Sequence, residues 1–415
     1  MTVRRQDVTQ RLAEYVSTLR YGDLPADVVK QAKKVILDAL GCQVACSMLE
    51  NGRLIIEFGQ SVGGQAEASV LGSNYKTSAV NAALVNGTLG HGDEIDESLE
   101  DVGHTSSVII PAALACGEKT GASGKDMITA VVAGYDMAGR LSNAGVPNIS
   151  GMSEFWGAAV GCNIMKLKAS ETRIAFGLAA LHSGSFFDLG SEAKHMAKSL
   201  MKGLSCRNGV TAALLAKMGY DGPKSVFDGD NNVLSDNVGE NYNQEELIKD
   251  LGKKFTIMNT CLKLYSAGHP IHAPAYGLLK ILTREGIKAE DIRLITARQP
   301  EREKQIVDNR AMPDITIQYC LAVAAFDHQL TWDQYTPERV QDPKVLNLKS
   351  RVTSVHDPKL DERKKITKAH SAEVDVETND GRKFTERVDY PPGDPQEGYV
   401  LCLQSSWAKK DQKPH

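Results

Sequence analysis

The sequence has no long apolar run, no strong charge of either sign and few aromatic residues. No apolar stretch reaches the roughly 18–20 residues that span a bilayer, so we expect no transmembrane helix. The formal net charge is only -4 over 415 residues, which gives no electrostatic reason to bind nucleic acid or an anionic membrane. The N-terminus has an amphipathic helical period rather than the apolar block of a signal peptide. We therefore expect a cytoplasmic protein that acts on small molecules.

Signatures of disulfide scaffolds, metal centres and nucleotide-binding loops are also missing. The eight cysteines are scattered and lie mostly among Ala, Val and Leu, as expected for buried thiols in a reducing compartment. Cys42 and Cys46 share one helix face, but no further ligand is near in sequence, so we interpret them as packing residues. In EKTGASGKD, Asp126 stands where a phosphate-binding loop requires Ser or Thr, which favours a helix connector. No GxGxxG follows a strand.

The chain is long enough for two domains, and its pattern of apolar and polar residues changes near residue 260. Up to residue 223 almost every stretch has the apolar spacing or small-residue composition of buried helices. Strand and helix patterns then alternate, and AEVDVETNDGRKFTERVDYP predicts a hairpin. We predict a mostly α protein with an all-helical domain over residues 1–260 that carries the pocket, a smaller α+β lid domain over 261–395, and a C-terminal tail over 396–415.

The most unusual stretch is VNGTLGHGDEIDESLEDVGHTSSVIIP, residues 85–111, where two histidines stand among six carboxylates. Charged groups leave water only at a cost of several kcal/mol unless they are paired, so the stretch is a solvated loop or the floor of a polar pocket. We favour the pocket. His104 precedes an apolar helix start, and an ordinary pKa near 6.5 suits an imidazole to proton transfer.

The carboxylates of this stretch have more than one interpretation. Clustered oxygens can chelate a hard cation, but the spacing lacks the Gly and distal Glu of an EF-hand loop. We favour a role in orienting His91 or His104 and fixing its tautomer. Three of them are interpreted as a solvated face: Glu97, Glu100 and Asp101.

Two basic segments could complete the pocket. If they converge, they form a cationic wall for a substrate with several carboxylates, because Arg binds a carboxylate through two hydrogen bonds and Lys acts as a point charge. The alternatives are that Lys202 and Arg207 are surface charges and that His272 caps the following helix. The two segments contain Lys198, Lys202 and Arg207, and Lys263, His269 and His272.

Several stretches together resemble the MmgE/PrpD family, which includes 2-methylcitrate dehydratases, cis-aconitate decarboxylase and an iminodisuccinate epimerase. They are NGTLGHGDEID with HTSSVIIPAALA, GYDMAGRL, KSLMKGLSCRNGVTAALLAKMGYDGP, LKLYSAGHPIHAPA, IQYCLAVAAF and DGRKFTERVDYPPGDP. The resemblance implies a helical domain with an α+β lid, a homodimer, and chemistry without metal, flavin or nicotinamide.

The resemblance also assigns roles to residues. It implies a catalytic imidazole at His104, catalytic lysines at Lys198 and Lys263, and a catalytic lid tyrosine at Tyr319. The chain departs from the family pattern in VPNISGMSEF, which has no histidine, and at Met201, where a histidine is common. The candidate substrate-binding residues are His91, Asp93, Glu94, Ser98, Lys202, Arg207, His269 and His272.

These residues predict a metal-independent lyase, a dehydratase or decarboxylase of a small di- or tricarboxylate. His104 would move a proton at a carbon next to a carboxylate, while the lysines stabilise the developing enediolate. The alternatives are an epimerase, which the missing histidine fits equally well, and a degenerate homologue that only binds a carboxylate.

Overall fold

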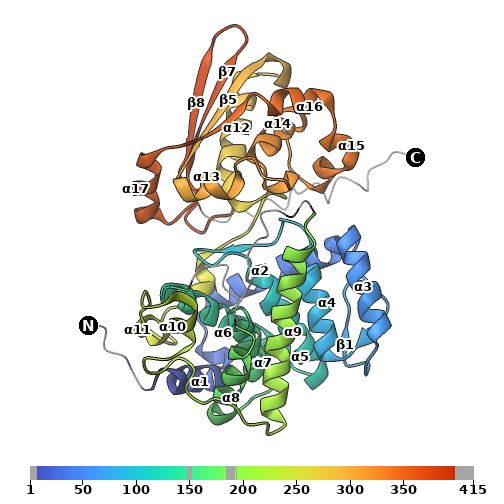
Figure 1. The fold of residues 1–415 in the computed structure, drawn as a ribbon, viewed down its shortest axis with the longest axis vertical. Coiled ribbons are helices and arrows are strands. Elements are labelled where there is room, and N and C mark those ends of the chain that lie inside the picture. The colour runs from blue at the N-terminus through green and yellow to red at the C-terminus, as the bar shows by residue number, and fades with distance from the viewer. Residues whose placement is uncertain (1–6, 147–151, 184–191, 193, 398–415) are drawn as a thin grey trace.

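The computed structural model describes residues 7–146, 152–183, 192 and 194–397, and Figure 1 shows two parts, one above the other. The lower part is helical. Its helices are α1 (Val8–Thr18), α2 (Ala26–Cys46), α3 (Glu50–Val62), α4 (Ala79–Leu89), α5 (Ser106–Thr120), α6 (Gly124–Asn143), α7 (Glu154–Ile164), α8 (Ala169–Ala180), α9 (Ala197–Lys217), α10 (Val233–Val238) and α11 (Glu245–Ile248).

The upper part is the α+β lid. Its sheet has the strand order β6 (Val352–His356), β5 (Ile292–Gln299), β7 (Ala372–Thr378) and β8 (Lys383–Val388), in which only β5 and β6 are parallel. The hairpin predicted from the sequence is β7–β8. The lid helices are α12 (His272–Glu285), α13 (Glu301–Val307), α14 (Ile317–Asp327), α15 (Pro337–Val340), α16 (Pro343–Lys349) and α17 (Pro358–Thr367).

Each part has its own hydrophobic core, which confirms the predicted fold class. The helical core runs in sequence from Val8 to Ile257, and the lid core begins at Tyr265. The expected domain division at residue 260 falls in this interval. No helix in the described ranges is both long and apolar enough to cross a membrane.

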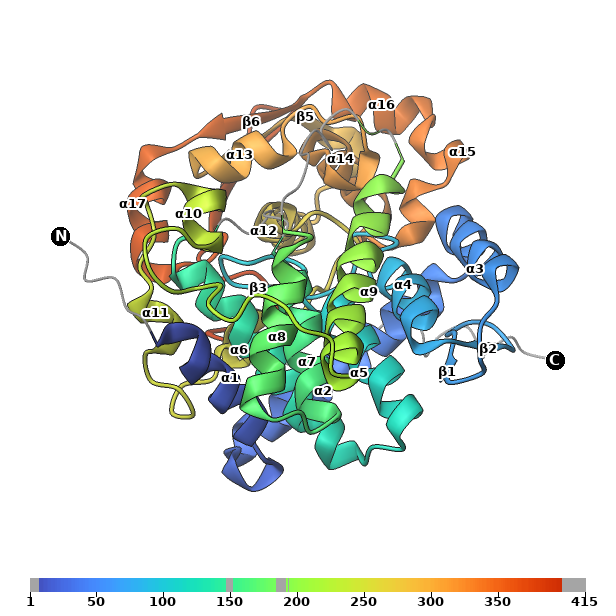
Figure 2. The same ribbon diagram turned by 60° about the horizontal axis from the view of Figure 1, so that its bottom comes forward.

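Small residues bring α4 and α9 into close contact at the centre of the helical part (Figure 2). A Cβ atom on Gly203 would lie 2.2 Å from Thr88 Oγ1 and 2.4 Å from the Leu84 carbonyl oxygen. A Cβ atom on Gly87 would in turn lie 2.9 Å from the Gly203 Cα. The glycines therefore allow the first turns of α9 to lie against the end of α4, where the acidic stretch begins.

A two-residue ribbon ties the acidic stretch to the segment that enters the lid. Strand β3 (Ser98–Leu99) pairs antiparallel with β4 (Thr260–Cys261), and Ser98 is opposite Cys261. Two residues after β4 comes Lys263. This pairing fixes the acidic stretch at the junction of the two parts. A second small ribbon, β1 (Ala68–Ser69) with β2 (Lys76–Thr77), lies at the edge of the helical part.

Candidate active site

Two histidines share one carboxylate at the junction. His91 Nδ1 is 2.9 Å from Asp96 Oδ1, and His104 Nδ1 is 3.1 Å from the same oxygen. The two rings lie 4.2 Å apart between centroids. Burial opposes ionisation of Asp96, but the neighbouring imidazoles lower its pKa below the ordinary value. An ionised Asp96 favours the tautomer of His104 with the proton on Nδ1, which leaves Nε2 as the basic atom.

Burial is the main influence on both imidazoles. It lowers the pKa of His91 and of His104, and for His104 it outweighs the opposing effect of Asp96. His91 is fully enclosed, whereas the His104 side chain keeps 16% of its surface exposed. Of the pair, His104 is therefore the neutral base that a small molecule can reach.

Glu94 brings the two predicted lysines together. Lys263 Nζ lies 2.8 Å from Glu94 Oε2 and donates to the Glu94 carbonyl oxygen at 2.9 Å, and Lys198 Nζ contacts Oε1. Burial disfavours a charged Glu94, but the two lysines hold its pKa well below the usual range. His104 Nε2 is 3.4 Å from Glu94 Oε2. The candidate base and both candidate lysines thus meet at one carboxylate.

Glu97 corrects the expectation of a solvated face. Its side chain is fully buried, and its Oε1 accepts hydrogen bonds from Thr105, Ser106 and Tyr135. Burial raises the pKa of Glu97 to about 7. The carboxylate anchors the start of α5 beside His104. Asp101 is exposed as expected, and Glu100 is only partly buried.

Asp93 and the lid approach each other on one side of this cluster. Ser266 Oγ donates to Asp93 Oδ2 at 2.5 Å. Burial, together with the nearby charge of Asp314, raises the pKa of Asp93. Asp93 is therefore a contact between the two parts of the molecule as well as a member of the predicted set.

His195 is a member of the cluster that the sequence interpretation missed. Its ring packs edge-on against His91 at 4.8 Å, and its Nδ1 lies 3.3 Å from Asp314 Oδ2 of the lid. His195 lies in the turn before α9, three residues ahead of Lys198, so its position in the basic segment was the available signal.

The predicted cations of α9 have different environments. Lys202 is buried, and its Nζ lies over the Trp156 ring at 5.3 Å, so it is not a surface charge. Burial lowers the pKa of Lys202 to about 8. No carboxylate within ion-pair distance of Lys202 occurs among the described residues. Arg207 is half-buried and donates to the neighbouring Asn208 side chain, so the structure does not bring it into the cluster.

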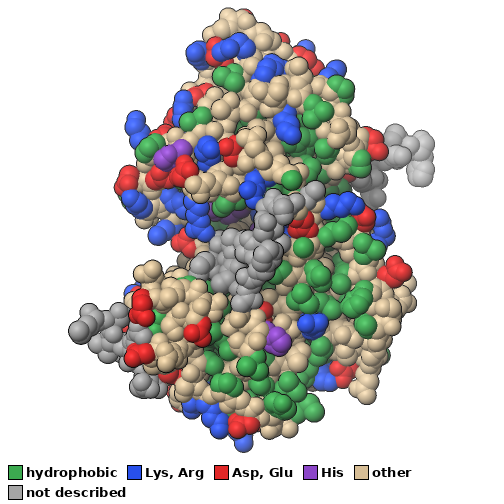
Figure 3. Space-filling view, viewed as in Figure 1, with side chains coloured by type: hydrophobic (Ala, Val, Ile, Leu, Met, Phe, Trp, Pro, Cys, Tyr) green, Lys and Arg blue, Asp and Glu red, His purple; other side chains and the backbone are tan. Residues whose placement is uncertain are grey.

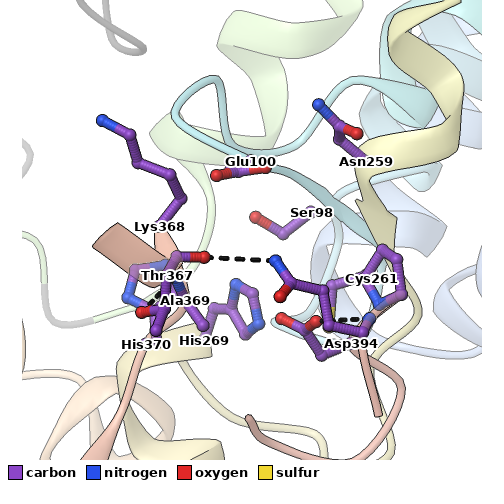
Figure 4. A pocket seen from close by; sticks show the side chains of 12 residues that line it. Ser98, Glu100, Asn259, Cys261, His269, Thr367, Lys368, Ala369, His370 and Asp394 are labelled. Atoms are coloured by element: carbon purple, nitrogen blue, oxygen red, sulfur yellow. Dashed lines mark hydrogen bonds between the residues drawn. The ribbon is translucent and has the colours of Figure 1, made fainter. Parts of the chain in front are cut away.

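Ser98 and His269 line a cavity between the ribbon β3–β4 and the lid, shown in Figure 4. Burial and the neighbouring His370 lower the pKa of His269. Burial raises the pKa of Glu100, which also faces the cavity, to about 7. The cavity adjoins the cluster through Ser98, two residues after Asp96.

Two predicted residues lie in the lid core instead. His272 is fully buried at the start of α12, where its Nε2 is 3.3 Å from the Ala267 carbonyl oxygen. The Tyr319 hydroxyl donates to the Gln334 carbonyl oxygen, and no contact with the charged cluster is found among the described residues. A catalytic role for Tyr319 stays a prediction, and it requires the hydroxyl to exchange this partner.

The donor atoms of the cluster are close enough to hold a cation in two ways, His91 with Asp96 and His104, or His91 with Glu94 and His195. In both sets the carboxylate already has cationic or imidazole partners. A metal in the second set would displace the lysines from Glu94, and in the first set Asp96 already contacts both imidazoles directly, so the arrangement favours acid–base chemistry over metal ligation.

Comparison with known proteins places the chain in a family. Residues 10–244 match the MmgE/PrpD N-terminal domain and residues 265–399 match the MmgE/PrpD C-terminal domain. A cis-aconitate decarboxylase-like protein of Aspergillus oryzae is 26% identical over 93% of this chain and 87% of its own length. A cis-aconitate decarboxylase of Aspergillus terreus is 24% identical over 94% and 86%.

A shorter match is to a relative that is named for a different activity. A probable 2-methylcitrate dehydratase of Saccharomyces cerevisiae is 31% identical over 28% of this chain and 24% of its own length. Both family domains, in order and over most of the sequence, show that this chain is a member of the MmgE/PrpD family.

Proposed function

We propose that the protein is a metal-independent lyase that decarboxylates or dehydrates a small di- or tricarboxylate. The observation that carries the proposal is the meeting of His104, Lys198 and Lys263 at Glu94, with Asp96 fixing the tautomer of the base. The full-length relatives named as cis-aconitate decarboxylases support decarboxylation, with cis-aconitate as the first acid to test.

His104 Nε2 acts as the base at the carbon next to a carboxylate. In dehydration it takes the proton from C–H, the electron pair forms the C=C bond, and the C–O bond breaks to release water after protonation of the hydroxyl. In decarboxylation the C–C bond breaks, CO2 leaves, and the electron pair remaining on carbon accepts a proton. In either case charge spreads onto a carboxylate, and preformed cations stabilise it.

Three buried or part-buried lysines supply those cations. Lys198 and Lys263 exchange some of their contact with Glu94 for a substrate carboxylate. Lys202 has no described carboxylate within ion-pair distance and is therefore ready for another one. A substrate with at least two carboxylates matches this distribution of charge.

The test is proton NMR of the EDTA-treated protein in D2O with citrate-, methylcitrate-, aconitate- and aspartate-like acids. A new alkene signal or the loss of a carboxylate supports the lyase without a metal. Deuterium entering next to a carboxylate, with the skeleton unchanged, would instead identify an epimerase. No turnover of any acid by the wild-type protein would overturn the proposal.

The same assay tests the base. If the converted acid is dehydrated, so that His104 removes a proton from carbon, His104→Ala should lower the rate about 10²–10⁴-fold, the usual contribution of a general base. A loss below about fivefold would remove His104 from that role. His182→Ala, at an exposed histidine that follows α8, is the matched control and should leave the rate unchanged.

A further inference from the structure

His195 remains without a role in the chemistry proposed above, although most of its side chain is enclosed at the junction. Its side chain is 9% exposed. Neither ring nitrogen has a partner with hydrogen-bond geometry among the described residues, and Nδ1 only approaches Asp314 at 3.3 Å. A buried polar ring without satisfied hydrogen bonds is costly, so a structural role alone does not account for it.

The position of His195 mirrors that of His104. Each imidazole packs on His91, at 4.2 Å for His104 and 4.8 Å for His195, and each faces a carboxylate through Nδ1. A nitrogen of His195 also lies within 4.8 Å of Glu94, the residue at which both lysines meet. His104 and His195 therefore both pack against His91 and both lie near the Glu94 carboxylate.

We infer that His195 is the second acid–base group of this enzyme, the general acid that delivers a proton from Nε2 opposite the base His104. It protonates the departing hydroxyl in dehydration, or the carbon that keeps the electron pair when CO2 leaves. The imidazolium loses one proton and returns to the neutral form, and the step needs no oxidant, reductant or co-reactant. The inference rests on the proposed lyase function.

The groups around His195 favour a charged ring there, whereas the surroundings of His104 favour a neutral one. Asp314 of the lid helix η6 (Pro313–Ile315) and Glu94 favour the charged ring, while burial and Lys198 of α9 oppose it. Burial is the largest single influence and opposes the charge, but Asp314 and Glu94 together raise the pKa of His195 above its ordinary value, whereas burial lowers that of His104. Groups whose environments separate their pKa values in this way are typical acid and base partners.

The sequence of this chain fits the inference. The segment VPNISGMSEF and position 201 both lack a histidine, and His195 is the histidine that the fold brings against His91 instead. Because Asp314 belongs to the lid and His195 to the helical part, the contact of the acid with Asp314 exists only while the two parts are together.

The experiment compares wild type, His195→Asn and the control His182→Asn in the NMR assay on the acid that the wild type converts. Asn retains an N–H that can face Asp314 but lacks Nε2. The assay is run at saturating substrate, so that a bound carboxylate keeps Lys202 charged and its titration does not affect the profile. A plot of the wild-type kcat against pH should then be bell-shaped, with His104 setting the acid limb and His195 the alkaline limb. His195→Asn should lower kcat at least tenfold and lose the alkaline limb, and His182→Asn should match the wild type.

The outcomes separate this inference from the proposed function. A wild type without turnover overturns both. An active wild type with His195→Asn within threefold of it, or with the alkaline limb retained, overturns only the role of His195. If His195→Asn melts well below the wild type, added imidazole with His195→Gly decides: recovery of kcat supports the acid, and no recovery refutes it.

Discussion

At the scale of single residues, Lys202 is a buried charge that we expect to bind a carboxylate of the substrate. Its ammonium lies over Trp156 and has no described carboxylate within ion-pair distance, although a buried ammonium is stable only with compensation. Lys202→Met should therefore raise KM about 10–150-fold, the range for a lost hydrogen bond to a charged group. kcat should change much less.

Kinetics on the substrate identified by NMR measure this split, with Lys217→Met on the exposed end of α9 as control. A KM within twofold of the wild type would mean that Lys202 is a structural charge. The same comparison separates Lys202 from Lys198 and Lys263, whose replacement should lower kcat as well.

Glu97 carries a second prediction, on stability. Burial raises its pKa to about 7 from 4.5, so the folded state holds a proton that the unfolded chain releases. The preferential protonation of folded Glu97 stabilises the fold fully below pH 4.5, and this stabilisation is lost as the pH rises through about 7. Glu97→Gln is neutral at every pH, and its stability relative to the wild type should improve by up to about 3 kcal/mol between pH 4.5 and pH 8.

Urea unfolding at the two pH values tests the effect of Glu97. Glu57→Gln, at an exposed position of α3, should show no pH-dependent difference from the wild type. A constant difference for Glu97→Gln would show that the carboxylate is ionised in the folded protein throughout.

At the scale of elements, the sequence predicted what local patterns determine. The β7–β8 hairpin, the connector before α6 and the helices of the N-terminal part follow from turn residues, a Ser123 cap and apolar spacing. The meeting of Lys198 and Lys263 at Glu94 could be anticipated only from a family resemblance, because the contacts join residues 104 and 169 positions apart.

What the sequence could not supply is the partner of each charge. Glu97 and the exposed Asp101 belong to the same run of carboxylates, and the sequence does not distinguish them. Glu97 is buried because Thr105 and Tyr135 donate hydrogen bonds to it when α5 and α6 pack together. His195 lies near Asp314 of the lid, which is far away in sequence. Tyr319 was expected in the pocket from the family resemblance, and its hydroxyl partner, a backbone carbonyl, has no sequence signal.

The contact between α4 and α9 gives a prediction at this scale. Gly203→Ala places a methyl group against the Leu84 carbonyl oxygen and Thr88, which must move the two helices apart. We expect a loss of about 1–3 kcal/mol in the free energy of unfolding, the usual cost of overpacking. Activity should fall as well, because Lys202 is adjacent in sequence and Lys198 lies one turn away.

The control for Gly203→Ala is Gly124→Ala at the start of α6, where an added Cβ atom would have no other atom within 4 Å. It should leave stability unchanged or raise it by less than about 1 kcal/mol. Equal unfolding midpoints for the two variants would show that the helices accommodate the methyl group.

At the scale of the whole molecule, we propose that the protein is a homodimer that pairs through α2 and α3. Leu54, Phe58 and Val62 follow one another at four-residue spacing on α3 and are 53%, 50% and 51% exposed. Three further exposed apolar side chains lie on or just after α2: Leu37, Val44 and Met48. Figure 3 shows hydrophobic side chains gathered on the same side of the helical part, over α3, α4 and α9.

An apolar stripe of this kind is typical of a surface that another chain covers, since a solvated helix face has polar residues at such spacing. The double substitution Leu54→Glu and Phe58→Glu should convert a species of twice the chain mass into a monomer in light scattering after gel filtration. Ile366→Glu, at an equally apolar but isolated position that is 83% exposed, should remain dimeric. A monomer that retains kcat would show that each subunit carries a complete site, whereas a wild type that is already monomeric would refute the pairing.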